Sequence, residues 1–208
     1  MCLPEKVRRS YLWRLKIKNI IVDLIRLQRY DYSLPGAYFI TVCTHKQKMF
    51  LEIKDVQMMI RSVWSSLPDR FFYLKLGEFV IIPNHIHAIL CINIVGADLV
   101  STRNKADTRS ARNKTTLMSA PTISRVVQTF KSITTYKYIS GVEENNWPLF
   151  DKRLWQRNYY DHIIRSEKSL NYIREYIINN PIRWEFDKEN SQGKMDEKEE
   201  NFWKEINS

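Results

Sequence analysis

The sequence has few cysteines and no long uninterrupted apolar run. Its three cysteines are too few for a disulfide framework and lack the spacing of a zinc site. The longest apolar stretch, residues 79–100, is interrupted by Pro83, Asn84 and two histidines, which excludes a membrane span. Residues 1–19 are too basic and too short of continuous apolar residues for a secretory signal peptide. We therefore expect a cytoplasmic protein.

Acidic residues are outnumbered by basic ones, 23 against 33, which gives a formal net charge of +10. A soluble protein with such an excess commonly binds nucleic acid or an anionic membrane surface. The excess is concentrated in residues 1–30 and 101–137, each with eight Lys and Arg residues, whereas the chain from residue 183 onward is acidic. This distribution is typical of a polyanion-binding face, although ordinary solvated surfaces can produce it too.

The spacing of apolar residues predicts one α+β domain over residues 30–187. Before it, residues 1–29 are expected to form a basic amphipathic helical extension, and after it residues 188–208 an acidic tail. The order strand, helix, strand, strand, helix, strand, helix is predicted over residues 37–44, 53–67, 72–82, 85–95, 120–139, 148–165 and 166–180. This order describes a ferredoxin-like (RRM-like) antiparallel sheet with helices on one face. Residues 96–120 are predicted to be a basic mobile loop inside the domain.

Two of the four histidines lie one residue apart in the stretch "PNHIHAIL". Side chains alternate along a strand, so His85 and His87 lie on the same face, with Cα atoms roughly 6–7 Å apart. Imidazole is a common ligand of divalent transition metals, so the pair is a candidate half-site, although both could be ordinary sheet residues. On the last helix, Tyr176 and Asn180 share one face and could supply a nucleophile and a further ligand.

Several segments, in a shared order, resemble a known family. "FVIIPNHIHAIL" resembles the HUH motif of the single-tyrosine HUH transposases. "LWQRNYYDHIIR" followed by "YIINNP" is similar to segments of the REP-associated tyrosine transposases and related small bacterial insertion-sequence transposases. "YDYSLPGAYFITVCTH" and "PTISRVVQTFKS" also match, so that the resemblance covers about residues 29–187.

The resemblance implies a metal-dependent DNA transesterase. In such an enzyme His85, His87 and Asn180 would bind Mg²⁺ or Mn²⁺, and Tyr176 would be the nucleophile; Tyr172 competes for that role by position. The enzyme would cleave and rejoin single-stranded DNA beside hairpins through a covalent 5′-phosphotyrosine intermediate. Dimeric relatives complete each active site with a helix from a second subunit, and the sequence leaves open whether this chain is a monomer or a homodimer.

Several residues are candidates for contacts with the DNA. Basic residues can bind phosphates and aromatic residues can stack on bases. The candidates are Arg125, Lys131, Arg157, Tyr159 and Arg165, with His162 as an accessory residue near the nucleophile. Two alternatives use related folds: a non-catalytic or decayed hairpin-binding protein, and a rolling-circle-type HUH nuclease.

Overall fold

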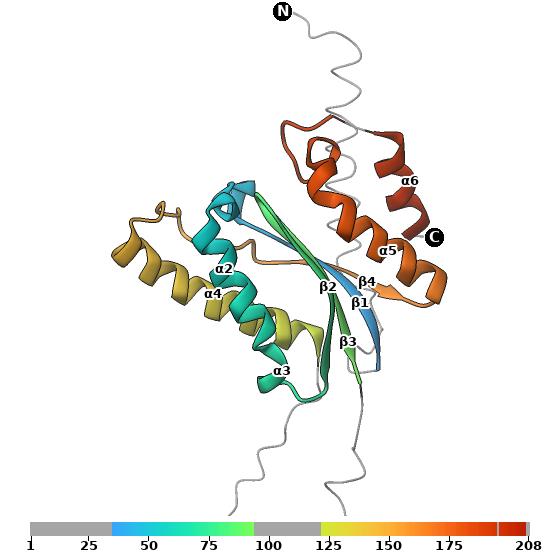
Figure 1. Ribbon diagram of the computed structural model, residues 1–208, viewed down its shortest axis with the longest axis horizontal. Helices are drawn as coiled ribbons and strands as arrows, with labels where there is room; N and C mark the ends of the chain where they lie inside the picture. Colours follow the sequence, from blue (N-terminus) through green and yellow to red (C-terminus); the bar gives the residue numbers. More distant parts are fainter. Residues whose placement is uncertain (1–34, 94–121, 195, 207–208) are drawn as a thin grey trace, which may run out of the picture.

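Four antiparallel strands form one sheet in the computed structural model, which describes residues 35–93, 122–194 and 196–206. The sheet order is β2-β3-β1-β4 (Figure 1). The strands are β1 (Gly36–Cys43), β2 (Leu74–Ile82), β3 (His85–Ile92) and β4 (Tyr160–Ile164). The predicted pair joined at Pro83 and Asn84 is confirmed as β2 and β3. The last predicted strand shortens to β4, because the chain before it follows a loop with one isolated bridge, Thr44 to Trp155.

Five α-helices and three short 3₁₀ helices are described around this sheet. They are η1 (His45–Gln47), η2 (Phe50–Glu52), α2 (Lys54–Ser65), α3 (Leu67–Arg70), α4 (Ile123–Asn145), α5 (Glu167–Asn179), η3 (Asn180–Phe186) and α6 (Glu197–Ile206). The side chain of Ser166 accepts a hydrogen bond from the backbone N–H of Ser169, as expected of an N-cap. Helix α4 extends beyond the predicted end. It stops at Asn146, whose backbone has the left-handed conformation that commonly ends a helix.

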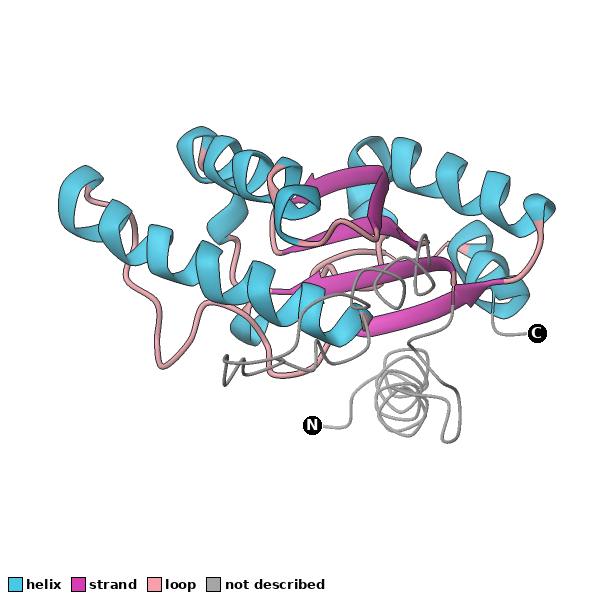
Figure 2. Cartoon of the chain, turned by 90° about the horizontal axis from the view of Figure 1, so that it is seen from below, coloured by secondary structure: helices cyan, strands magenta, loops and turns pink. Residues whose placement is uncertain are grey.

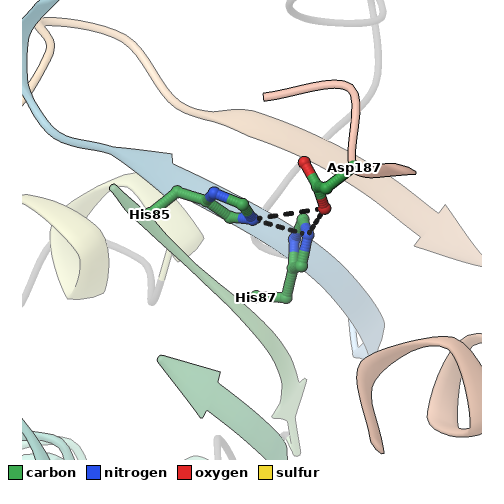
Figure 3. Close-up of side chains that lie close together, drawn as sticks. All are labelled: His85, His87 and Asp187. Atoms are coloured by element: carbon green, nitrogen blue, oxygen red, sulfur yellow. Dashed lines mark hydrogen bonds and ion pairs between the residues drawn. The ribbon is translucent and has the colours of Figure 1, made fainter. Parts of the chain in front are cut away.

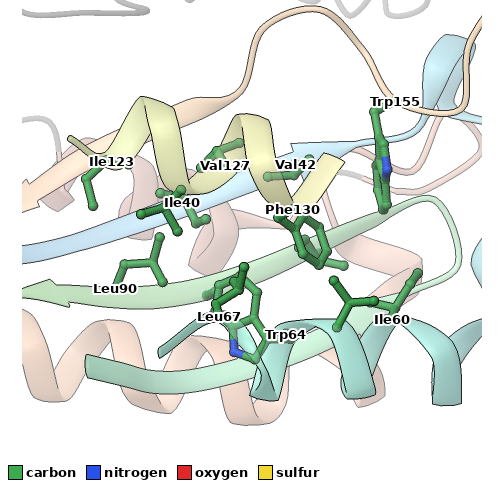
Figure 4. Packing of buried hydrophobic residues seen from close by; sticks show 14 of the residues in the cluster. Ile40, Val42, Ile60, Trp64, Leu67, Leu90, Ile123, Val127, Phe130 and Trp155 are labelled. Atoms are coloured by element: carbon green, nitrogen blue, oxygen red, sulfur yellow. The ribbon is translucent and has the colours of Figure 1, made fainter. Parts of the chain in front are cut away.

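The larger hydrophobic core lies between the sheet and the helices α2 and α4 (Figure 4). Alternate residues of β1 face it, with Ile40 and Val42 packed near Phe130 of α4 and Trp64 of α2. The sheet with α2 and α4 has the connectivity and the strand order of the predicted ferredoxin-like arrangement. The α+β fold class is therefore confirmed.

Helices cover both faces of the sheet, which corrects the prediction that they lie on one face. α5 and α6 lie on the side opposite α2 and α4, and the strands lie between the two helical layers (Figures 1 and 2). The physical reason is that β1 and β3 bury residues on both faces: Phe39 and Ile89 belong to a second core with Ile173 and Ile177 of α5. A sheet that is apolar on both faces needs cover on both.

Part of the segment expected as an acidic tail contributes to this second core. Phe202 and Ile206 of α6 are 3% and 5% exposed, and the ring of Phe202 stacks on that of Tyr176 with centroids 3.6 Å apart. The acidic residues of α6 give the segment its charge, but its apolar stripe packs on the domain. The helix therefore forms one wall of the region around Tyr176.

We expect Phe202→Ala to lower the free energy of unfolding by about 3–5 kcal/mol, because the substitution leaves a cavity under α6. Urea denaturation measures the change. The control Ile182→Ala removes a side chain that is 85% exposed and should change stability by less than about 0.5 kcal/mol. Equal effects of the two substitutions would contradict the packing of α6.

Two predicted segments lie outside the described residues: the basic N-terminal helix and the basic loop at 96–120. Among the helices of residues 35–93, 122–194 and 196–206, none has the length and hydrophobicity needed to cross a bilayer.

Candidate metal centre and nucleophile

His85 and His87 lie on one face of β3, as the alternation predicts, and they point toward α5 and η3. Both side chains are fully buried. Their ring centroids are 4.4 Å apart and their Nε2 atoms are 2.9 Å apart (Figure 3). Two imidazoles therefore converge on one point inside the protein.

The outer nitrogen of each imidazole already has a partner. Asn84 donates its amide N–H to the carbonyl of Glu189, so its Oδ1 faces His85 and accepts a hydrogen bond from Nδ1 at 2.7 Å. The Nδ1 of His87 lies 2.9 Å from the hydroxyl of Thr41. Metal-binding histidines are typically held in this way by their second nitrogen. Both Nε2 atoms are thus directed to the same place.

Asp187, which follows η3, completes the group. Its Oδ2 lies 3.6 Å from each Nε2, and ligand atoms of the three residues all lie within 4.8 Å of one another. Burial alone would raise the pKa of Asp187, but the neighbouring His85, the hydrogen bond to His87 and the amide of Asn180 lower it well below its usual range. The carboxylate is therefore ionised in this buried place.

Asn180, predicted as the third ligand, lies beside the group and holds Asp187. Its Nδ2 donates to Oδ2 of Asp187 at 2.7 Å. Its buried Oδ1 accepts no hydrogen bond from any described residue. Two imidazole nitrogens, a carboxylate oxygen and this unpartnered amide oxygen fit a divalent metal ion such as Mn²⁺. The donor set thus suits the metal implied by the sequence, with Asp187 added to it.

Tyr176 lies on the face of α5 that is directed at the histidines. Its ring centroid is 5.3 Å from that of His87, and its side chain is 8% exposed. The hydroxyl donates to Oε1 of Glu199 at 2.9 Å and lies 3.5 Å from Oδ2 of Asp187. Burial raises the pKa of this phenol well above its usual value, and the carboxylates of Asp187 and Glu199 raise it further.

Tyr172 lies one helical turn before Tyr176 and is 37% exposed. Its ring stacks on Phe202 with centroids 5.3 Å apart. The structure thus brings Tyr176, and not Tyr172, to the candidate metal ligands His85, His87 and Asp187, which together form the metal-ligating group. Tyr176 and these three residues belong to the same chain.

The predicted DNA-contacting residues fall into two groups. Arg125, Arg157 and Arg165 are exposed. Lys131, in contrast, donates to three backbone carbonyls, those of residues 156–158, at 2.9–3.3 Å. Burial lowers the pKa of its ammonium group to about 8. Tyr159 bonds through its hydroxyl to Ser124. Lys131 and Tyr159 therefore anchor the loop before β4, while the three arginines lie on the surface.

His162, the predicted accessory residue, lies on β4 opposite Phe39 in the strand pairing and is half-buried. Burial lowers the pKa of its imidazole to about 4. Among the described residues, the hydroxyl of Tyr176 forms its hydrogen bonds with Glu199 and Asp187 rather than with His162.

Sequence reasoning missed both carboxylates of the site. Asp187 follows an irregular 3₁₀ segment, whose residues show no periodic pattern, and Glu199 lies in the segment expected as an acidic tail. The one available signal was the aromatic residues Trp184, Phe202 and Trp203 between the acidic ones, which indicate that the segment packs on something.

A comparison with known proteins identifies a relative of similar length. The chain is 37% identical over 174 residues to an uncharacterised protein of Haemophilus influenzae, covering 78% of this chain and 89% of that protein. The chain belongs to the family of this Haemophilus protein. No protein-family model matches the sequence.

One solved structure shows what fold this chain has. A REP-associated tyrosine transposase bound to a REP hairpin matches with a TM-score of 0.50 and 19% identity, over 78% of this chain and 76% of that one. This likeness confirms, for the fold, the resemblance seen in the sequence. A transposase candidate from Deinococcus radiodurans is also similar, with a TM-score of 0.40 and 16% identity over 74% of this chain and 95% of that one.

We expect the metal-free protein to lose stability as the pH falls from about 6.5 to about 4. Burial lowers the pKa of His85 from 6.5 to about 4, so below pH 6.5 protons bind the unfolded state more readily than the folded state. The full effect is about 3 kcal/mol for this residue, and His87 and His162 act in the same direction. Urea denaturation at pH 7, 5.5 and 4.5 tests this; a constant or rising midpoint would show that the histidines are not buried.

Proposed function

We propose that this protein is a single-tyrosine HUH transposase that cleaves and rejoins single-stranded DNA beside hairpins. One observation carries the proposal: a buried phenol, Tyr176, lies against two histidines and a carboxylate that can bind one metal ion. Its fold is that of a REP-associated tyrosine transposase, and that protein was solved with a REP hairpin. A module that only binds DNA would have no use for this group.

His85, His87 and Asp187 would hold the ion, with the free Oδ1 of Asn180 beside them. When bound, a divalent ion supplies Lewis acidity to a non-bridging oxygen of the scissile phosphate. Asn84 and Thr41 fix the two rings, and Asn180 fixes the carboxylate. The ligands therefore need little rearrangement on binding, which favours affinity.

Tyr176 supplies the attacking oxygen in this proposal. The bond between Oη and phosphorus forms while the bond from phosphorus to the 3′-oxygen of the DNA breaks, leaving a 5′-phosphotyrosine and a free 3′-OH. The phenol is protonated at neutral pH, because its pKa is raised above the usual value near 10. The carboxylate of Glu199, which already accepts its hydrogen bond, can take the proton. A second 3′-OH reverses the step and joins strands.

The proposal is tested with single-stranded oligonucleotides that carry hairpins from the flanks of the gene, labelled at the 5′ or the 3′ end. We expect a covalent adduct that forms with Mn²⁺, is prevented by EDTA and retains the DNA on the 3′ side of the cut. Tight hairpin binding without any adduct would instead identify a DNA-binding protein with this fold.

A further inference from the structure

Two loops at the metal-ligand end of the sheet line an open pocket of about 370 Å³ that the proposed chemistry does not use. One loop, residues 45–50, follows β1, and the other, residues 149–153, follows α4. The volume falls in the range of about 300–1,000 Å³ that is common for small-ligand pockets. We refer to it as the loop pocket.

The lining of the loop pocket includes both basic and apolar side chains. Lys48 and Arg153 carry positive charge, and Phe50 and Leu149 form the apolar part. Leu149 is 81% exposed, so its apolar side chain is accessible to a ligand. The one acidic residue in the lining, Asp151, is paired with Lys46 at 2.8 Å. The remaining charge of the pocket is therefore positive.

The backbone of both loops is strained. Among the described residues other than glycine, four have a positive φ, and three of them belong to these loops: Lys46 (56°), Gln47 (55°) and Lys152 (64°). Such conformations are costly for residues with a side chain and gather at functional sites. Contacts maintain them here, since Gln47 donates to the carboxylate of Glu189 and Lys46 pairs with Asp151 across the pocket.

Short hydrogen-bond paths join the loop pocket to the metal-ligating group. Thr44, directly before the first loop, donates its backbone N–H and its hydroxyl to the carbonyl of Asn84. The side chain of Asn84 in turn accepts the hydrogen bond from His85. On the other side, Glu189 binds Gln47 through its carboxylate and Asp187 through its backbone N–H. Asn84 and Glu189 therefore contact both the first loop, or Thr44 directly before it, and the metal-ligating group, so the pocket lies beside that group.

We propose that the loop pocket binds one nucleotide of the single-stranded flank next to the scissile phosphate. Its phosphate would face Lys48 and Arg153, and its base would lie against Phe50 and Leu149. A flat base on an apolar wall and a phosphate beside cations are the two contacts by which single strands are held without base pairing. The inference rests on the proposed function and adds to it a site that reads the flank rather than the hairpin.

The test compares two DNA probes by fluorescence anisotropy: a hairpin alone, and the same hairpin with its natural single-stranded extension. The double variant Lys48→Gln/Arg153→Gln should bind the extended probe at least about tenfold more weakly and the bare hairpin as well as the wild type. The slope of log affinity against log salt for the extended probe should fall by about 0.7, which is the value for one lost phosphate contact to a single strand.

Two further variants separate charge from the apolar wall. Leu149→Ser, at an exposed position, should weaken binding of the extended probe while leaving its salt slope unchanged. The control Arg70→Gln/Lys75→Gln removes two exposed charges at the opposite end of β2 and should have no selective effect on the extended probe. Equal losses for both probes with the loop-pocket variant, or no loss at all, would overturn the inference.

The outcome is distinguishable from failure of the proposed function. If the loop-pocket double variant forms the covalent adduct with unchanged preference for the flank, the function stands and the pocket proposal fails. If the wild type forms no adduct but binds the extended probe through Lys48 and Arg153, the pocket proposal stands and the catalytic one fails. A wild type that binds both probes equally refutes the pocket proposal as well.

Discussion

Tyr176→Phe should abolish the covalent DNA adduct, lowering its rate of formation by at least about 10³-fold. The substitution removes only the hydroxyl oxygen that attacks phosphorus in the proposed reaction. The ring remains, and with it the stacking on Phe202 and the contact with His87. Hairpin affinity should therefore be unchanged, so that the loss is seen in chemistry and not in binding. Denaturing gel electrophoresis of the labelled 3′ fragment measures the adduct.

Tyr172→Phe is the matched control, because it removes a hydroxyl from the same helix one turn away. Tyr172 is partly exposed and stacks on the outer side of Phe202, so its variant should form the adduct within about twofold of the wild type. Loss of the adduct in Tyr172→Phe with retention in Tyr176→Phe would assign the nucleophile to Tyr172. Loss in both would indicate that the variants disturb the packing of α5 against α6.

The parts of the site that could be predicted from sequence are those governed by regular geometry. His85 and His87 share a face because strand side chains alternate, and the structure places them together. Tyr176 and Asn180 are four residues apart on one helical row, and the structure places Tyr176 against His87 and Asn180 against Asp187. Periodicity thus supplies which residues face the same way, whereas the face of the sheet that α5 covers was not predicted, because all helices were expected on one face.

Asp187 and Glu199 could not be predicted in the same way. Neither lies in a segment whose local pattern fixes the direction of its side chain: Asp187 follows a 3₁₀ turn, and Glu199 belongs to a charged helix that is amphipathic only through Phe202 and Ile206. An acidic residue is expected at the surface unless a partner compensates its burial. The partners here are the two histidines, the amide of Asn180 and the hydroxyl of Tyr176, which come together only through the tertiary fold.

Metal binding should distinguish Asp187 from Asn180 as the third ligand. Isothermal titration with Mn²⁺ alone should show that Asp187→Asn lowers affinity by more than about 100-fold, because it removes the negative charge from a set that otherwise has two neutral imidazoles. Asn84→Ala, which removes only the partner that orients His85, should cost about 10–100-fold. At a Mn²⁺ concentration of 100 times the dissociation constant, the wild type should gain about 2.7 kcal/mol of stability, reversed by EDTA.

Asn180→Ala provides the decisive comparison, since Asn180 both donates to Asp187 and offers an unpartnered oxygen. If Asn180 acts only by holding Asp187, Asn180→Ala should lower the affinity for Mn²⁺ by about as much as Asn84→Ala does. If its Oδ1 also contacts the ion, Asn180→Ala and Asp187→Asn should each cost more than about 100-fold. Retention of wild-type affinity in Asp187→Asn, with loss in Asn180→Ala, would return the third-ligand role to Asn180. In that case Asp187, whose Oδ2 lies 3.6 Å from the Nε2 atom of each imidazole, serves to orient the two rings instead.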